Sequence, residues 1–524
     1  MTISMLQEEK KIKKHLFWLV IISLFVRAFL AATLELGNDE AYYWTYALFP
    51  DLSHFDHPPM VGWMIQFFSL NLIIDSEFFL RLSSLLLGTI NILLVYQIGC
   101  KVKNARTGLY AAYLYVASLY GSIITGVFIL PDTPLVFFWL ISLSIFISFI
   151  RSNKEIGNKK PYLIWIGISV GLAMLSKYNG AFLWITILAF LFFFERKQLF
   201  KINIWIGIII SILIFIPVII WNFKYGFISF TFQGARVNFF GNGISLKHIS
   251  VELLGQMSYL NPIVFILIWI ACYKLIFKNN FIDKKISAFL LLTGLPIIGL
   301  MVLFSFFRST LPHWACPGYL GMLFIPAAYL DEKKDVSQRN IFIPKVIQVA
   351  LLFIVIVISI GFIEIKSGVF QLKKLTGDDL TLDIFGWKQA GEKFVSVNNR
   401  LVEQKRIKAD ALLLSWRWFP GANEDYYFAR KMHKKVVLIG HLDKIHKYAW
   451  INRIRGDIQP GDDAYFIVSA HDFRPPEILE GVVFDSVIPV DTILIERNKQ
   501  TVDKVFVFIL KNLKSYDKEY YLPE

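Results

Sequence analysis

Charged side chains are scarce in this chain. Asp, Glu, Lys and Arg together make up 18% of its 524 residues, whereas hydrophobic residues make up 56%. The mean hydropathy is +0.53, and a soluble protein of this length would carry more charge. Several apolar runs also exceed the roughly 18 residues that are needed to cross a bilayer. The composition therefore excludes an ordinary soluble protein and predicts a polytopic α-helical membrane protein.

Cysteine is rare, and two common sequence signals are missing: a signal-peptide cleavage site and a phosphate-binding glycine motif. The three cysteines, Cys100, Cys272 and Cys316, each lie at or near the end of an apolar run, which does not fit a disulfide framework or a metal–thiolate site. The first apolar run, residues 16–34, lacks a small-residue cleavage pattern, so we expect a retained helix and not a signal peptide. The polar tail contains no phosphate-binding glycine motif, which argues against nucleotide binding.

Basic residues outnumber acidic ones by 54 to 40, which gives a net charge of +14. Most of them lie in short loops between apolar runs, so we interpret them as orientation signals and expect no nucleic-acid partner. The basic residues 1–15 predict a cytoplasmic N-terminus, and the alternation of basic loops predicts about eleven transmembrane helices within residues 1–365. Because eleven is odd, residues 366–524 are expected outside the cytoplasm.

The composition of the tail changes at about residue 366. From there it becomes polar and mixed, with five short runs of strand-forming residues that are separated by helical or loop stretches. This pattern predicts a small extracytoplasmic α/β domain. The expected strands cover residues 411–414, 435–439, 464–468, 482–490 and 505–510.

The densest polar chemistry of the first 150 residues lies in residues 38–63, directly after the first apolar run. This stretch holds the acid pair Asp39 and Glu40, then Asp56 and His57 before a double proline, with aromatic residues between the two pairs. One interpretation is a solvated loop with an interfacial aromatic belt. The other is a polar site at one bilayer face, which two acidic clusters and a rigid double proline favour.

Isolated charged residues are further candidates for a functional role. Arg27 lies inside the first apolar run, where an unpaired charge is costly, so we expect it to face a partner or a polar cavity. Lys177 and Arg308 are lone charges at predicted external turns, where they break the alternation of basic loops. We expect the external catalytic segments to be residues 38–79 and 222–255.

Several short motifs resemble those of the family-39/83-type membrane glycosyltransferases, which include protein O-mannosyltransferases and lipid A aminoarabinose transferases. The first external loop of that family is matched by Asp-Glu-Ala-Tyr-Tyr-Trp and Phe-Asp-His-Pro-Pro-Met. Each motif is short, but the set follows the family's order, and the compact tail fits the bacterial branch better. The matching segments are residues 39–44, 55–60, 131–135, 171–177, 312–314 and 386–388.

The resemblance implies a fold of the GT-C type and a reaction at the outer face of the bacterial inner membrane. A sugar would move, with inversion, from a polyprenyl (undecaprenyl) phosphate carrier to an envelope acceptor. Lipid A or lipopolysaccharide core is the expected acceptor, with a protein as the less favoured alternative, and the enzyme is expected to act as a monomer among membrane lipids. A transporter or flippase of a lipid-linked sugar is the main competing hypothesis; it would place polar features near the bilayer midplane, often in two repeated halves.

The chemistry of such a transfer assigns roles to external side chains. The transition state carries positive charge on the sugar ring, and a phosphate leaving group needs cations more than a strong acid. His57, Lys177, Arg236 and Arg308 are the cations expected to hold the phosphate by charge-assisted hydrogen bonds. Asp132 is expected to bind the donor sugar, and the alternative for it is a helix-capping role.

The acid pair is the expected catalytic group. A hydroxyl acceptor would need a base, and Asp39 beside Glu40 is the first choice, because two neighbouring carboxylates can raise the pKa of one of them. With a phosphate acceptor, Asp39 would instead orient the acceptor or offset the charge of the ring. Asp56 and His57 could bind a divalent metal ion, and no other cofactor is expected.

Overall fold

A computed structural model describes residues 3–152, 160–236, 243–278, 280–333, 343–371 and 379–517 of the chain. The chain forms two compact units. The first polar loop groups with the tail, although more than 300 residues separate the two in sequence. The helical unit comprises Met1–Ala32, His57–Ile220 and Gly234–Val357, and the tail unit comprises Thr33–Asp56, Trp221–Gln233 and Ile358–Glu524.

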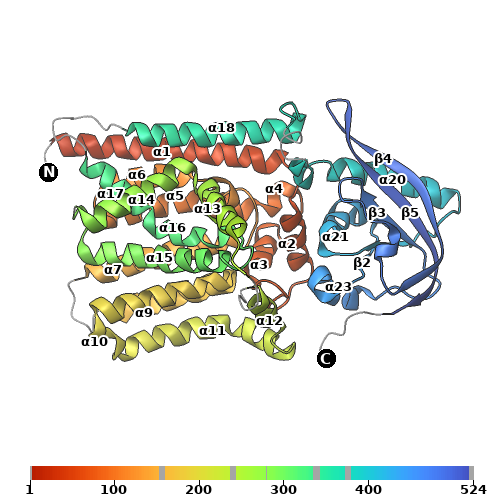
Figure 1. Cartoon of the computed structure of the whole chain (residues 1–524), viewed down its shortest axis with the longest axis horizontal. Helices are drawn as coiled ribbons and strands as arrows, with labels where there is room; N and C mark the ends of the chain where they lie inside the picture. Colours follow the sequence, from red (N-terminus) through yellow and green to blue (C-terminus); the bar gives the residue numbers. More distant parts are fainter. Residues whose placement is uncertain are drawn as a thin grey trace. The chain divides into compact units, whose positions relative to one another are not determined.

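Long apolar helices dominate the helical unit (Figure 1). Six helices of the described residues are long and apolar enough to cross a membrane, and a bent pair, α13 and α14, makes a seventh if it counts as one span. The protein is thus an integral membrane protein. The six are α1 (Ile3–Thr33), α5 (Leu82–Val102), α7 (Asp132–Arg151), α11 (Ile202–Lys224), α15 (Lys284–Ser305) and α18 (Lys345–Ser367).

The predicted count of eleven crossings is not confirmed. Several of the apolar runs behind that count are divided into shorter helices by turns and by changes of helix type. Within the run at residues 107–124, for example, α6 (Ala105–Ala117) ends, and a π-helical turn, Tyr120–Ile124, follows it. The shorter helices are α3 (Met60–Phe68), α4 (Glu77–Leu80), α8 (Lys160–Ser176), α9 (Phe182–Phe194), α10 (Arg196–Leu199), α16 (Cys316–Met322) and α17 (Phe324–Glu332).

The segment that was expected as a long external loop, residues 222–255, contains helices on either side of residues 237–242, which lie outside the described part of the chain. These helices are α12 (Ile228–Ala235) and α13 (Leu246–Leu260). The chain then bends by 100° into α14 (Pro262–Phe277). Asn261 takes a positive φ of 72°, and the next residue, a proline, has no N–H to continue the helix.

Two buried arginines of the helical unit find backbone partners. Arg27 is 2% exposed, and its guanidinium donates to the carbonyl oxygens of Gly121 (3.4 Å) and Ser122 (3.1 Å). Arg81 donates to the carbonyl oxygen of Ala31 at 3.1 Å. The prediction that Arg27 faces a partner is confirmed, and the π-helical turn supplies that partner.

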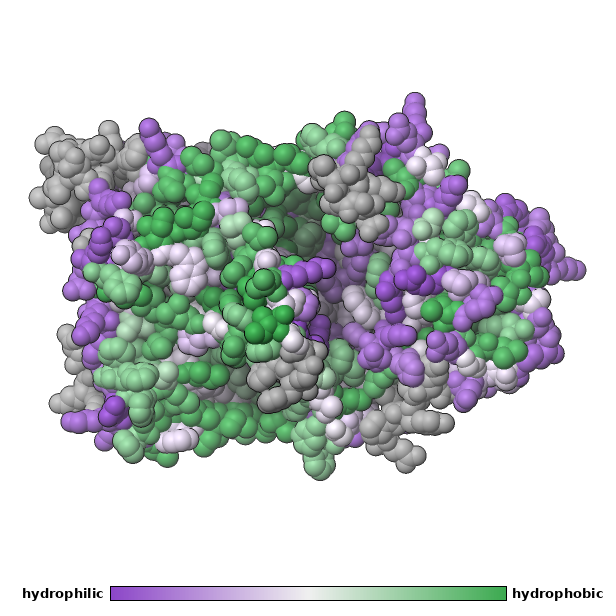
Figure 2. All heavy atoms as spheres, viewed as in Figure 1, coloured by the Kyte–Doolittle hydropathy of each residue, from purple (hydrophilic) through white to green (hydrophobic). Residues whose placement is uncertain are grey.

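The surface of the long helices is apolar. Figure 2 shows hydrophobic side chains covering the visible face of these helices, and Phe25, Phe193 and Leu303 are among the large side chains that are at least half exposed. Such an extended apolar surface is unfavourable in water and suits contact with lipid.

A five-stranded sheet forms the core of the tail unit. The strand order is β2-β1-β3-β5-β4, in which β1 pairs with β2 and β3 in parallel and β5 pairs with β3 and β4 in an antiparallel sense. All five strands lie where the sequence predicts them, although β4 and β5 are longer. The strands are β1 (Leu412–Ser415), β2 (Val436–Leu438), β3 (Ala464–Ser469), β4 (Val482–Arg497) and β5 (Gln500–Tyr516).

The buried strands of the sheet are covered by helices of the same unit. Nearly every residue of β1, β2 and β3 is buried, as is typical of parallel strands that are covered on both faces. Helix α21 packs against β1 and β2, α23 packs against β2, and α2 of the first loop packs against α21. The helices of this unit are α2 (Asn38–Leu48), α20 (Trp387–Glu403), α21 (Trp418–Glu424), α22 (Leu442–Ile445) and α23 (Tyr448–Arg455).

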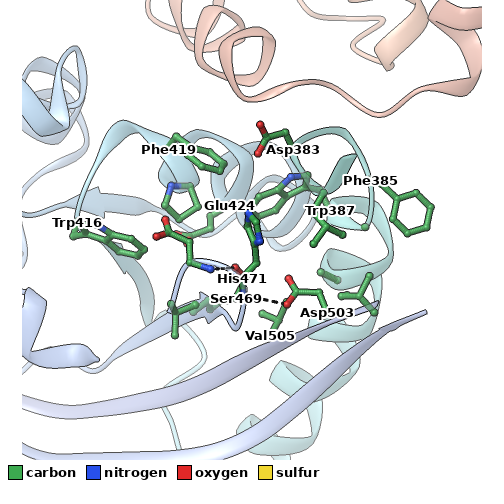
Figure 3. Close-up of a pocket in the computed structure, with 18 residues that line it drawn as sticks. Asp383, Phe385, Trp387, Trp416, Phe419, Glu424, Ser469, His471, Asp503 and Val505 are labelled. Carbon is green, nitrogen blue, oxygen red and sulfur yellow. Dashed lines mark hydrogen bonds between the residues drawn. The ribbon is translucent and has the colours of Figure 1, made fainter. Parts of the chain in front are cut away.

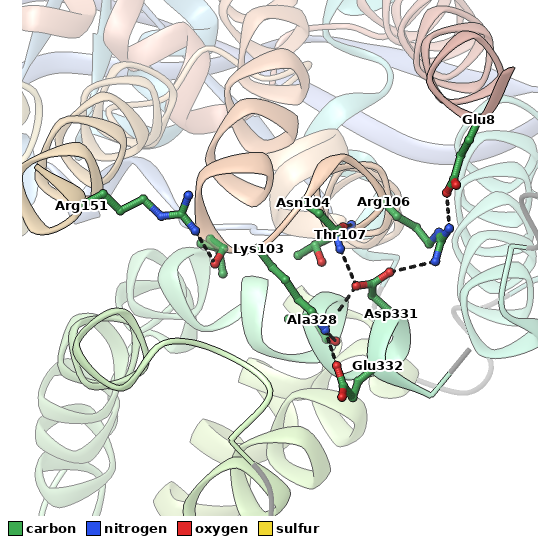
Figure 4. A network of polar contacts seen from close by, with 10 residues as sticks. Glu8, Lys103, Asn104, Arg106, Thr107, Arg151, Ala328, Asp331 and Glu332 are labelled. Atoms are coloured by element: carbon green, nitrogen blue, oxygen red, sulfur yellow. Dashed lines mark hydrogen bonds and ion pairs between the residues drawn. The ribbon is translucent and has the colours of Figure 1, made fainter. Parts of the chain in front are cut away.

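A polar network joins three helix ends of the helical unit (Figure 4). The carboxylate of Asp331, at the end of α17, accepts from Asn104 (2.8 Å) and pairs with Lys103 and Arg106 (3.3 Å each). Lys103 also pairs with Glu332 at 2.6 Å. Asp331 is 8% exposed, so its charge is largely removed from water and depends on these partners.

This network predicts that Asp331 and the neighbouring Glu332 contribute differently to the stability of the protein. Asp331→Asn should lower the free energy of unfolding by about 1–3 kcal/mol, because Lys103 and Arg106 each lose one of their two carboxylate partners at a largely buried position. Glu332→Gln is the control, and it should cost less than about 1 kcal/mol, because the Glu332 side chain is 55% exposed. Thermal unfolding of both variants in detergent measures the difference, and equal melting temperatures would contradict the role given to Asp331.

Candidate active site

The acid pair of the first loop lies in the first turn of α2. Gly37 precedes the helix in an extended conformation, and its N–H donates to Glu40 Oε2 at 2.9 Å. Glu40 is 2% exposed and so caps the helix from within. Asp39 is exposed in the same first turn. Of the two predicted catalytic acids, Asp39 is therefore the one that a substrate can reach.

Asp56 is held by two tyrosines of α2. Its Oδ1 accepts from the hydroxyl of Tyr42 at 2.8 Å and from the hydroxyl of Tyr46. The Gln233 side chain donates to the Asp56 carbonyl oxygen at 2.6 Å. Burial, followed by the nearby charge of Asp56, raises the pKa of both tyrosines well above the ordinary value, so they remain hydrogen-bond donors.

A buried lysine of the tail binds the same loop. Lys447 Nζ donates to the Phe49 carbonyl oxygen and lies 2.7 Å from His54 Nδ1, and the ammonium group lies over the Tyr46 ring. Lys447 is 4% exposed. Burial lowers its pKa well below the ordinary value, an effect that the charges of Asp51 and Asp56 oppose. This amine therefore fixes the segment between the two acid pairs.

In the helical unit, Asp132 and Lys177 form a buried ion pair. Asp132 is the first residue of α7, and Lys177 follows the last residue of α8. Lys177 Nζ donates to Asp132 Oδ2 at 2.7 Å, and the Tyr120 hydroxyl donates to Asp132 Oδ1 at 2.8 Å. Because an ammonium group has three donors, this pair leaves Lys177 able to hold a second anion.

The turn Pro312–Trp314 gathers the other predicted cations. The charges of Lys177, Asp132, His57 and Arg236 all act on His313. Burial, with Lys177 as the next largest cause, lowers the pKa of His313 to about 3, and the ring is neutral at pH 7.

The arginines flank this turn. The Arg236 guanidinium lies 5.2 Å from the centre of the Trp314 ring, and Arg308 donates to the carbonyl oxygen of Ala235 at 2.6 Å. Asn179, two residues after Lys177, donates to the Trp314 carbonyl oxygen at 3.2 Å. Arg236 and Asn179 thus contact the turn Pro312–Trp314, whereas Arg308 contacts Ala235, the residue before Arg236.

The metal ion suggested at Asp56 and His57 stays a prediction for the described residues. Within those residues, no group of three or more His, Cys, Asp or Glu side chains is placed to hold one. The tyrosine hydroxyls already occupy Asp56 Oδ1. No step of the reaction is assigned to a metal.

Sequence reasoning missed several residues of these groups. Tyr42 and Tyr46 could have been found, because their spacing places them on one face of α2. Local spacing does not mark His313, since the charges that act on it come from residues far away in the sequence. No local signal marks Lys447, whose partners lie about 400 residues earlier.

Two comparisons of sequence show proteins that this chain resembles. The profile of the family described as dolichyl-phosphate-mannose-protein mannosyltransferase matches residues 56–221. The lipid A galacturonosyltransferase RgtD of Rhizobium johnstonii is 21% identical over 282 residues, which cover 54% of this chain and 58% of that protein. The match therefore spans little more than half the length of this relative.

Solved structures show the same fold. ArnT from Cupriavidus metallidurans bound to undecaprenyl phosphate superposes with a TM-score of 0.61, over 94% of this chain and 97% of that chain, at 12% identity. The apo form gives 0.57 with the same coverage and identity. The predicted resemblance to membrane glycosyltransferases of the GT-C class is confirmed.

Removing the buried amine should loosen the first loop. In Lys447→Met, the Phe49 carbonyl and His54 lose their partner, so amide hydrogen exchange over residues 49–56 should become at least about tenfold faster. Lys444→Met, at an exposed position of α22, is the control. Equal exchange in the two variants would show that Lys447 does not order this segment.

The neutral His313 predicts an acid sensitivity. Its pKa is about 3 in the folded protein and about 6.5 when unfolded. As the pH falls below about 6.5, only the unfolded state takes up the proton, so stability is lost down to about pH 3. Between about pH 7 and pH 5, the melting temperature of the wild type should fall further than that of His313→Gln. The exposed control His433→Asn should behave like the wild type, and a parallel fall in all three would contradict the assignment.

Proposed function

We propose that this protein is a glycosyltransferase of the bacterial inner membrane. It moves a sugar, with inversion, from a polyprenyl phosphate such as undecaprenyl phosphate to a glycolipid acceptor, lipid A or lipopolysaccharide core, at the outer face. The observation that carries the proposal is the set of cations around the buried pair Asp132 and Lys177. The likeness of fold to ArnT, which has been solved with undecaprenyl phosphate, supports the same conclusion.

The cations of the helical unit suit a phosphate leaving group. When the bond between the sugar and the phosphate breaks, negative charge grows on the phosphate oxygens. Lys177 keeps free ammonium donors, and Arg236 can bind two oxygens at once. The neutral His313 can give or accept a hydrogen bond without adding charge. These groups stabilise the leaving phosphate, and Asp132 holds Lys177 in place.

Asp39 acts on the acceptor of the sugar. A hydroxyl acceptor would give its proton to this exposed carboxylate as it attacks the anomeric carbon. If the acceptor is a phosphate group, the carboxylate orients it or offsets the positive charge of the ring. Glu40 supports this role because it fixes the helix turn on which Asp39 stands.

The test is transfer by the purified full chain in detergent. A radiolabelled polyprenyl-phosphate sugar is supplied with a membrane lipid extract, and label on the lipid A fraction is measured. Asp39→Asn should lower the transfer rate at least about 100-fold, because it removes the base or the charge that the reaction uses. Asp443→Asn is the matched control, since Asp443 is likewise an exposed aspartate in the first turn of a helix.

Two outcomes would contradict the proposal. Transfer by Asp39→Asn within about threefold of the wild type would remove this residue from the reaction. If the wild type transfers no label but moves it across a vesicle membrane, the protein is a transporter and not an enzyme.

A further inference from the structure

A pocket opens at one edge of the tail sheet (Figure 3). Trp416 follows β1, and Ser469 ends β3, so the pocket lies at the carboxyl ends of two parallel strands. Ligands of open α/β sheets bind at this edge. The pocket is partly open to solvent, with about 50 Å³ of space for the centres of water-sized molecules. The residues that line it include neither the cations proposed to hold the phosphate nor the acid pair of the first loop.

The pocket walls are aromatic. Trp387, Trp416 and Phe419 line it, together with Phe385. The centres of the Trp387 and Phe419 rings lie 6.0 Å apart, and the ring planes meet at 76°, so the edge of one ring faces the other ring. Flat, rigid rings of this kind offer a large apolar contact area to the C–H face of a ring-shaped ligand.

Two buried polar atoms of the pocket lack a partner among the described residues. One is Oε2 of Glu424, whose side chain is almost fully buried at 1% exposed, and the other is Nε1 of Trp387. Burial raises the pKa of Glu424 well above its ordinary value, an effect that a side-chain hydrogen bond with Ser415 opposes. Leaving such groups unpaired is costly, and native proteins rarely do so without a ligand, water or function.

The two atoms suit hydroxyl groups. The indole N–H can only donate, whereas a protonated carboxyl group can donate and accept. A sugar hydroxyl also does both, so neighbouring hydroxyls of one ring could satisfy both atoms. An ammonium group or a purely apolar ligand would leave the indole N–H without an acceptor.

The surrounding charges exclude an acidic ligand. Asp383, Asp472 and Asp503 also line the pocket. The Asp472 carboxylate is paired with Arg417, and Asp503 Oδ1 accepts from the backbone N–H of His471 at 3.2 Å. Arg417 and Arg474 both pair with Asp472, and the described residues of the lining include no lysine or arginine, which favours a neutral or amine-bearing ring over one with a carboxylate or phosphate.

We propose that this pocket binds a saccharide ring without acid groups, stacked on the aromatic wall and hydrogen-bonded to Glu424 and Trp387. The site is independent of the proposed transfer reaction. It gives the tail a carbohydrate-binding function of its own, whether the ring belongs to a glycolipid or to a free glycan.

Saturation-transfer NMR on the full chain tests this inference. The protein is held in nanodiscs, because detergents with sugar headgroups would compete for the pocket. Methyl glucoside, methyl glucosaminide and methyl glucuronide are the probes. We expect the first two to bind and the glucuronide not to bind. An oligosaccharide cut from the envelope glycolipid, compared with the same glycan on its lipid, separates the two sources of the ring.

The pocket residues supply matched variants. Trp387→Phe keeps an aromatic ring but removes the N–H, and Glu424→Met keeps the length but removes both oxygens. Each should weaken binding about tenfold or more. Trp165→Phe and Glu403→Gln change exposed residues elsewhere and should bind like the wild type.

Three results would overturn the inference: no binding of any neutral sugar to the wild type, equal binding of the glucuronide, or unchanged affinity in both pocket variants. The sugar panel on the wild type decides the matter even if a variant does not fold. Because no polyprenyl donor is present, a failure here leaves the proposed transferase untouched, and a failure of transfer leaves this site untouched.

Discussion

The structure depends on one constraint: a charge that is buried away from water must meet its partner inside the protein. An unpaired ion in such a place costs several kcal/mol, and backbone polar groups are costly as well. Lys177 meets Asp132 at 2.7 Å. Arg27 meets two carbonyl oxygens of a π-helical turn at 3.1 and 3.4 Å. In both cases the partner lies at a helix end or at an irregular turn, so these places are where the charges of the helical unit are satisfied.

The same constraint shapes the proposed chemistry. Because Asp132 already balances Lys177, a phosphate that arrives at this pair does not find an excess of positive charge from it. The attraction rises as the bond to the sugar breaks and the phosphate gains negative charge, and that gain is what Lys177, Arg236 and Arg308 can stabilise. Interactions that strengthen only toward the transition state raise the rate, whereas equal binding of the ground state would not.

Features that depend on residues close together in the sequence were predicted from the sequence. The five strands of the tail were found from their strand-forming residues, and Arg27 was expected to have a partner because a lone charge in an apolar run is costly. The predicted number of crossings is not confirmed, because turns such as the one at Asn261 divide apolar runs without changing their hydropathy. The acid pair was located, but its division into the cap Glu40 and the exposed Asp39 depends on the backbone of Gly37. The cations were chosen from their places at turns, while the partnership of Lys177 with Asp132 needed the packing of α7 against α8.

Lys447 shows why the tail unit includes the first loop. A loop as long as residues 33–56 loses much conformational entropy when it is ordered, and short-range contacts alone seldom compensate for this. The buried amine supplies a donor for the Phe49 carbonyl and a partner for His54, and the two tyrosines of α2 hold Asp56. Within this unit, the order of the segment that carries Asp39 and Asp56 thus comes from a residue of the tail. A tail that only shielded the membrane part would have no reason to bury a lysine against this loop, so its contact with the loop is best understood as support for the acids that the loop presents.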